Sequence, residues 1–111
     1  MTAITHGEGD LEIVDATVGT TKYSEVVDIS NYDGYAVTAI WTAAGATGSI
    51  ELQASTDNIN YISITGTSQS IAGSGSWLWN VYNPFYRYFR VAVASTLSTI
   101  STAIRFNTRS L

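Results

Sequence analysis

Apolar and polar residues alternate with a period of two over much of this chain. The pattern is clearest in Ser49–Ser55, where Ile50, Leu52 and Ala54 point one way and the intervening polar residues point the other. The turn-forming residues of Thr56–Asn60 follow, so this region predicts a hairpin. The same alternation predicts about eight strands, at Leu11–Val18, Lys22–Ile29, Tyr35–Thr42, Ser49–Ser55, Tyr61–Ile64, Trp77–Val81, Tyr88–Ala94 and Thr99–Asn107.

About eight short strands, spaced about ten residues apart and without a helical period, are typical of sandwiches and jelly rolls. We therefore predict an all-β fold, an antiparallel β-sandwich of the jelly-roll type. At 111 residues the chain has room for one such domain. We place it at residues 11–107, with an N-terminal arm at 1–10 and a C-terminal tail at 108–111, both of which could reach a neighbouring molecule.

Composition indicates how such a domain is stabilised. The chain has no cysteine, which excludes disulfides and thiolate metal sites, so stability must come from packing. Hydrophobic residues make up 45% of the chain and charged residues only 13%, well below the roughly 25% of an ordinary domain. A composition so poor in charge suits strands whose outward faces carry hydroxyl groups. It also suits a protein whose surface is largely covered by neighbouring molecules.

Charge is distributed unevenly along the sequence. All nine acidic residues lie between Met1 and Asp57, whereas the only charges from Asn58 onward are four arginines. Either strands of the two halves interleave and mix these charges, or the domain has two faces of opposite sign that favour contact between copies. Four arginines without a lysine-rich patch argue against nucleic-acid binding.

No targeting or membrane segment is evident. The N-terminal residues lack the basic start and apolar run of a secretory signal, and no apolar stretch approaches the ~20 residues that span a bilayer. The sequence therefore predicts synthesis in a cytoplasm and no membrane partner.

Candidate catalytic and metal-binding groups are sparse. His6 is the only histidine and falls in the predicted arm, so we expect it to be solvated, and no nucleophile elbow or phosphate loop is present. Asp57 is expected to cap its own turn, and the alternative is a weak calcium site with Asn58 and Asn60. We predict no enzymatic activity, no catalytic residues, no cofactor and no metal.

A cluster of aromatic residues around Pro84 is the remaining candidate for function. In one interpretation it closes an end of the core; in the other it is a stacking platform for sugar rings or an anchor at a protein interface. The candidate platform or interface residues are Trp77, Trp79, Tyr82, Phe85, Tyr86 and Arg87.

Two stretches carry a resemblance to known families. The pattern L-Q-A-S-T-D-x-x-x-Y at Leu52–Tyr61 and Y-R-Y-F-R-V-A-V at Tyr86–Val93 are similar to features of galactose-binding-like and discoidin-type jelly rolls. The chain also resembles small β-sandwich virion proteins of tailed bacteriophages, which are likewise rich in Ser and Thr and free of cysteine.

The phage resemblance implies a capsid decoration, or cement, subunit on the virion surface, made in the host cytoplasm. It implies a major capsid protein as partner and a homotrimer as the assembly. The alternative is a carbohydrate-binding or adhesion module of a tail or fibre, with a glycan as its ligand.

Overall fold

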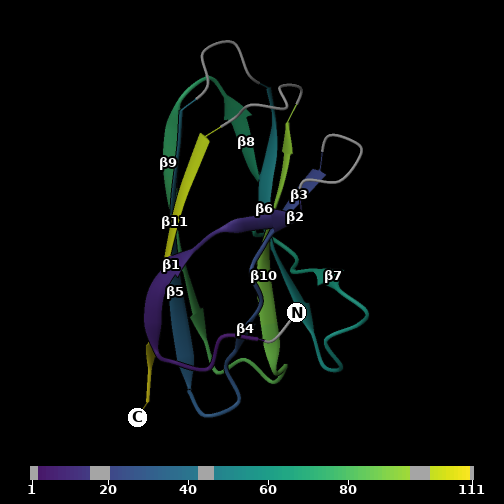
Figure 1. The fold of residues 1–111 in the computed structure, drawn as a ribbon, viewed down its shortest axis with the longest axis vertical. Coiled ribbons are helices and arrows are strands. Elements are labelled where there is room, and N and C mark those ends of the chain that lie inside the picture. The colour runs from purple at the N-terminus through teal and green to yellow at the C-terminus, as the bar shows by residue number, and fades with distance from the viewer. Residues whose placement is uncertain (1–2, 16–20, 43–46, 96–100, 111) are drawn as a thin grey trace.

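The computed structural model describes residues 3–15, 21–42, 47–95 and 101–110, and within them eleven strands form two facing sheets (Figure 1). This confirms the predicted antiparallel β-sandwich. No helix in these segments is long and apolar enough to cross a membrane. The strands are β1 (Glu8–Leu11), β2 (Ile13–Asp15), β3 (Thr21–Ser24), β4 (Val27–Asp28), β5 (Gly34–Thr42), β6 (Thr47–Ser55), β7 (Ile62–Ser63), β8 (Gln69–Ala72), β9 (Gly75–Tyr82), β10 (Tyr88–Ser95) and β11 (Ser101–Arg109).

The two sheets differ in size. The four-stranded sheet has the order β1-β11-β5-β9 and lies on the left in Figure 1. The seven-stranded sheet has the order β2-β3-β10-β6-β7, with β4 also pairing with β10 and β8 with β6. All named strand pairs are antiparallel. Strand β9 is therefore an edge strand, and β5 lies between β11 and β9.

The two most regular stretches of the sequence pair with each other. Strand β6 runs beside β10 from Gly48, opposite Ser95, to Ser55, opposite Tyr88. The predicted hairpin also forms, because Gln53 of β6 pairs with Ser63 of β7. These pairings make β6 and β10 the centre of the larger sheet.

The turn of this hairpin is held by Asp57, as the sequence predicted. Its Oδ1 accepts hydrogen bonds from the backbone N–H groups of Ile59 and Asn60, each at 2.9 Å, and from the Ser55 hydroxyl at 2.8 Å. Asn58 adopts φ 61°, a left-handed conformation that asparagine tolerates better than most residues. The carboxylate of Asp57 is thus occupied by its own turn.

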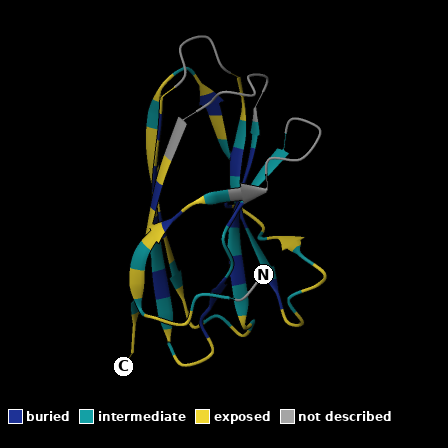
Figure 2. Ribbon diagram, in the orientation of Figure 1, coloured by how far each residue is buried: buried dark blue, intermediate teal, exposed yellow. Residues whose placement is uncertain are grey.

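The core lies between the sheets and follows the predicted alternation except at the end of β6, where Ser55 is buried and Ala54 is only half-buried (Figure 2). Phe89 of β10 stacks on Tyr35 of β5, with ring centroids 4.1 Å apart, and meets the ring of Phe106 edge-on at 6.3 Å. These contacts join the two sheets. Other fully or almost fully buried side chains are Val27, Ile29, Val37, Ala39, Ile50, Leu52, Ile71, Val91, Val93 and Ile104.

Three details of the sequence prediction need correction. The boundaries placed after residues 10 and 107 both fall inside strands, since β1 begins at Glu8 and β11 continues to Arg109. The predicted strand Lys22–Ile29 is divided into β3 and β4, and β8 was missed. The predicted strand Leu11–Val18 is also divided, because β1 ends at Leu11 and β2 spans Ile13–Asp15. These two divisions and the missed β8 explain why the described strands number eleven instead of about eight. Residues 16–18 and 99–100 of two predicted strands lie outside the described residues.

The acidic and basic halves of the sequence mix in the fold. Arg105 of β11 lies 3.4 Å from Asp10 and 3.5 Å from Glu8, both in β1, and Arg87 lies 3.0 Å from Asp28. Each pair joins an acid of the first half to an arginine of the second. The geometry therefore favours the interpretation in which strands of the two halves interleave.

Candidate functional site

The predicted aromatic platform is divided between the two faces of β9. Trp79 faces the core, with 5% of its surface exposed, and its indole N–H donates to the Thr67 carbonyl at 2.8 Å. Because side chains alternate along a strand, Tyr82 lies on the opposite, outer face, and it is 80% exposed. Trp79 and Tyr82 cannot bind one ligand together.

Tyr86 is also a structural residue. Its hydroxyl lies 2.7 Å from the hydroxyl of Tyr35, so the two phenols share a hydrogen bond. Burial raises the pKa of Tyr35 far above its ordinary value, and the bond with Tyr86 adds to the shift. This arrangement agrees with the interpretation in which part of the cluster closes one end of the core.

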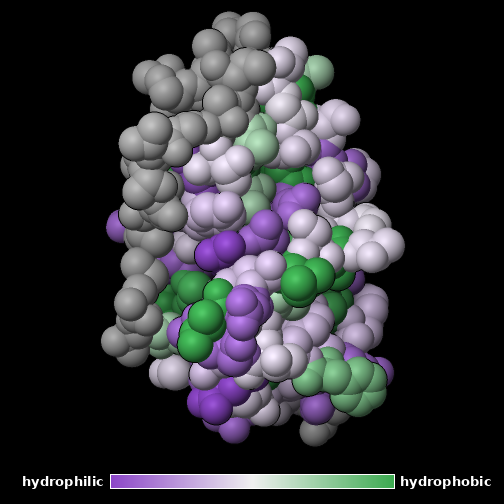
Figure 3. Space-filling model, turned by 90° about the vertical axis from the view of Figure 1, so that its right-hand side faces the viewer, coloured by the Kyte–Doolittle hydropathy of each residue, from purple (hydrophilic) through white to green (hydrophobic). Residues whose placement is uncertain are grey.

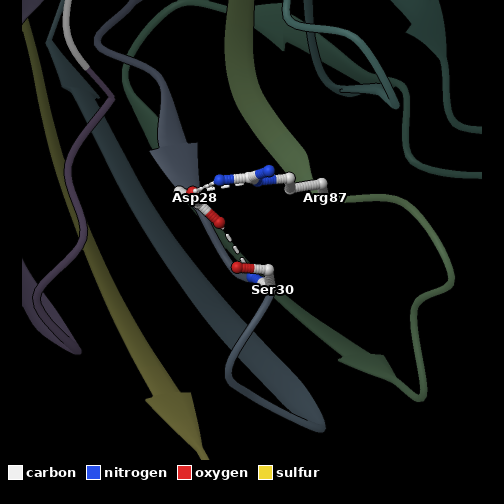
Figure 4. Close-up of polar contacts among 3 residues, drawn as sticks. All are labelled: Asp28, Ser30 and Arg87. Carbon is white, nitrogen blue, oxygen red and sulfur yellow. Dashed lines mark hydrogen bonds and ion pairs between the residues drawn. The ribbon is translucent and has the colours of Figure 1, made fainter.

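Arg87 is held by Asp28 (Figure 4). Its Nε and Nη2 donate to the same carboxylate oxygen at 3.1 and 3.0 Å, while the backbone N–H of Ser30 donates to the other oxygen at 2.9 Å. Burial by itself raises the pKa of Asp28, but the bonds from Arg87 and Ser30 outweigh it and hold the pKa below its usual value. Arg87 therefore fixes β10 to β4.

Two further predicted residues are exposed and lie apart from any described hollow. Phe85 is fully exposed and Trp77 is 46% exposed, and neither lines either of the two hollows described below. Of the predicted site residues, Tyr82 alone lines the larger hollow.

The larger hollow is a shallow groove on the outer face of the four-stranded sheet, with a volume of about 380 Å³. Gly34 and Ala36 of β5 form its floor. The strand register places Asn80 and Asn107 on either side of Ala36, and Tyr82 and Arg109 on either side of Gly34. The groove exists because β5 has a glycine and an alanine at these two positions, where the neighbouring strands β9 and β11 have larger residues.

Gly34 is required at its position by the approach of β9. A Cβ atom there would lie 2.8 Å from the carbonyl oxygen of Val81, a backbone atom that cannot move away freely. The same absence of a side chain leaves the floor of the groove low. Packing of the sheet and the shape of the groove therefore depend on the same residue.

The polar side chains on the two banks are available to a ligand. Within the described residues, the side chains of Asn80, Tyr82, Asn107 and Arg109 take part in no hydrogen bond or ion pair. All four are exposed. Donors, acceptors and an aromatic ring therefore surround the floor without partners in the protein.

A second hollow, of about 360 Å³, lies beside β7 and is less suited to binding. Its polar residues Ser55, Asp57 and Asn60 already bond one another in the hairpin turn. Figure 3 views the side of the molecule that carries β7 and shows hydrophobic side chains among weakly and strongly hydrophilic ones. Ile59 and Ile62 are 80% and 71% exposed. Few free polar groups remain here to orient a ligand.

Sequence reasoning missed most of the groove. It selected Tyr82 but not Asn80, Asn107, Arg109 or Ala36. The available signal was alternation: in each of β5, β9 and β11 the residues opposite the buried set are candidates for an exposed face. Their meeting around a low floor depends on strand order, which the sequence does not give.

No family model matches this sequence, and no curated protein matches it. Among solved structures, a family 89 glycoside hydrolase from Clostridium perfringens superposes with TM-score 0.54 at 14% identity, over 95% of this chain and 14% of the hydrolase. The C-terminal domain of a chitobiase from Bacteroides fragilis gives 0.49 at 16% identity, over 82% of this chain and 64% of that one. A family 32 carbohydrate-binding module of a family 31 hydrolase from C. perfringens gives 0.49 at 14% identity, over 90% and 93%.

These comparisons correct the expected function. The prediction of a capsid decoration subunit is wrong, because the structure that superposes with a TM-score of 0.54 is part of a glycoside hydrolase. The expected major capsid protein partner and homotrimer were implied only by the phage resemblance, and nothing supports them. What this likeness shows is the β-sandwich fold. The chain thus shares the fold of a segment of a much longer glycoside hydrolase.

Proposed function

We propose that this chain is a non-catalytic carbohydrate-binding module and that the groove over Gly34 and Ala36 is its binding site. The observation that carries the proposal is the set of unpartnered side chains around that floor: the Tyr82 ring, the amides of Asn80 and Asn107, and the Arg109 guanidinium. Carbohydrate-binding modules also occur among the solved structures with this sandwich.

The chemistry of these groups suits a sugar. Each sugar hydroxyl is both a donor and an acceptor, and an asparagine amide supplies both functions in one side chain. The exposed ring of Tyr82 gives an apolar surface with a polar tip, against which the C–H face of a pyranose can pack. A few convergent polar groups beside an apolar surface are what small-molecule sites generally contain.

The groove is also rigid enough for binding. Its floor and both banks belong to β5, β9 and β11, which are paired along the whole length of the groove. Sites on paired strands lose little entropy when a ligand binds, because their backbone is already ordered.

Hydrolysis of the bound sugar is not part of the proposal. Glycosidases generally use two carboxyl groups about 5–9.5 Å apart. The lining of the groove has one carboxylate, Asp33. Binding without cleavage is therefore the function that these residues support best.

A glycan array followed by calorimetric titration tests the proposal. The protein should bind at least one glycan, and Tyr82→Ala should weaken that binding by at least about tenfold, equivalent to about 1.4 kcal/mol. Phe85→Ala is the matched control, because Phe85 is an exposed aromatic residue outside the groove. An array without a bound glycan, or equal losses in both variants, would show that the groove is not a sugar site.

A further inference from the structure

The length of the groove floor limits how much of a glycan fits. Residues on the same face of a strand repeat every two positions, so Gly34 and Ala36 lie about 6.6 Å apart. The next residue on this face is Thr38, whose neighbours are Arg105 on one side and Leu78 on the other. Larger side chains therefore end the low floor after two residues, a length that matches one pyranose ring.

The width of the groove also matches one pyranose ring. Adjacent strands lie about 4.8 Å apart, so the backbones that carry Asn80 and Asn107 are separated by about 10 Å across Ala36. Tyr82 and Arg109 are separated in the same way across Gly34. Two amides, a phenol and a guanidinium can thus surround a single ring, and a longer chain would have to leave over the side of Gly34 and Asp33.

The charges of the groove cancel. The negatively charged Asp33 and the positively charged Arg109 both line the groove. Their backbones are joined by a hydrogen bond of 2.9 Å from the Asp33 N–H to the Arg109 carbonyl. The nearest other arginine on this face, Arg105, is paired with Asp10 and Glu8. No net positive charge is therefore available to favour an acidic sugar.

From these observations, and resting on the function proposed above, we infer that the groove takes one uncharged sugar ring at the end of a glycan. Asp33 accepts hydrogen bonds from the hydroxyls of the sugar, and Arg109 donates hydrogen bonds to them. Asn80 and Asn107 contact opposite edges of the sugar ring. The site selects a terminal residue because Thr38 and its neighbours end the floor.

Titrations with defined sugars test this inference. The probes are the methyl glycosides of glucose, galactose, mannose and N-acetylglucosamine, with methyl glucuronide as the acidic counterpart. For the neutral sugar that binds, oligosaccharides with the same terminal residue should bind within about threefold of the methyl glycoside. Raising the salt from 50 to 500 mM should change the affinity by less than about twofold, since no net charge is involved.

A substitution of Asp33 should increase the affinity for an acidic sugar. A purely structural role of Asp33 would not produce this gain. Asp33→Asn leaves Arg109 uncompensated, so the variant should bind methyl glucuronide at least about fivefold more tightly than the wild type does, in a salt-dependent manner. Glu12→Gln is the matched control, because Glu12 is an exposed carboxylate that does not line the groove. It should leave the affinity for methyl glucuronide unchanged.

The outcomes separate this inference from the proposed function. Binding that depends on Tyr82 but prefers the acidic sugar, or that strengthens about tenfold or more with chain length, overturns the single neutral ring and leaves sugar binding intact. Failure of Asp33→Asn to gain affinity for the acidic sugar also overturns it. If no probe and no array glycan binds, the proposed function and this inference fail together.

Discussion

The substitution Leu52→Ala tests the central register of the sandwich. Leu52 lies in β6, is completely buried and pairs opposite Val91 of β10. Its backbone N–H and carbonyl bond Thr67 and Ile64, and the substitution leaves these groups in place. The change therefore removes side-chain packing and little else.

The magnitude follows from the atoms that are lost. Leucine has three more carbon atoms than alanine, and each buried carbon group contributes about 0.8 kcal/mol, which gives about 2.4 kcal/mol. A residual cavity of roughly 40–80 Å³ adds about 1–2 kcal/mol at about 24 cal/mol per Å³. We expect the free energy of unfolding to fall by about 4 kcal/mol, measured by urea titration with tryptophan fluorescence.

The adjacent residue provides the control. Gln53 faces outward, and its side-chain oxygen accepts a hydrogen bond from Arg90 at 2.8 Å. The Gln53 amide also donates to the Glu51 carboxylate at 3.2 Å. Gln53→Ala removes both bonds and should cost about 1–3 kcal/mol, at about 0.5–1.5 kcal/mol for each bond. Leu52→Met, which conserves volume, should cost less than about 1.5 kcal/mol. Similar losses in Leu52→Ala and Gln53→Ala would refute the assignment of these two residues to opposite faces of β6.

Two further predictions concern backbone packing and pH. Gly34→Ala should destabilise the fold by about 1–3 kcal/mol, seen as a lower urea midpoint, because the new Cβ meets the Val81 carbonyl; an unchanged midpoint would contradict this contact. Burial raises the pKa of Asp28, but the bonds from Arg87 and Ser30 lower it by more, so the net pKa in the folded protein is below its usual value. The stabilising contribution of the Asp28 carboxylate is therefore complete above about pH 4, and it is lost as the pH falls through the folded-state pKa. Asp28→Asn should therefore flatten the loss of stability between pH 4 and pH 2 in urea titrations, and an unaltered pH dependence would count against this role.

Much of the fold was predictable because it depends on a strict local period. Alternation in Ser49–Ser55 and Tyr88–Ala94 identified the two central strands, and the turn chemistry of Asp57 identified the hairpin between β6 and β7. Strand β8 was missed because Gln69–Ala72 contains one strongly apolar residue, Ile71, among polar neighbours. That residue is buried only because β8 pairs with β6.

The candidate site was less predictable, and the tryptophans illustrate why. Trp77 and Trp79 are the most conspicuous aromatic residues, yet period two places them on the core side of β9, and Trp79 is buried there. Tyr82 differs from Trp79 by an odd number of positions and so lies on the outer face. Parity along the strand decides which aromatic residue can meet a ligand, and the sequence prediction grouped both parities together.

The sequence by itself determined the class of fold and the central hairpin, since these follow from local period and turn residues. Only the tertiary structure brought Gly34 and Ala36 between Asn80 and Tyr82 of β9 and Asn107 and Arg109 of β11. Those strands are far apart in the chain, and their order in the sheet is set by how the two layers bury their apolar faces together. The groove is a property of that order and not of any one strand.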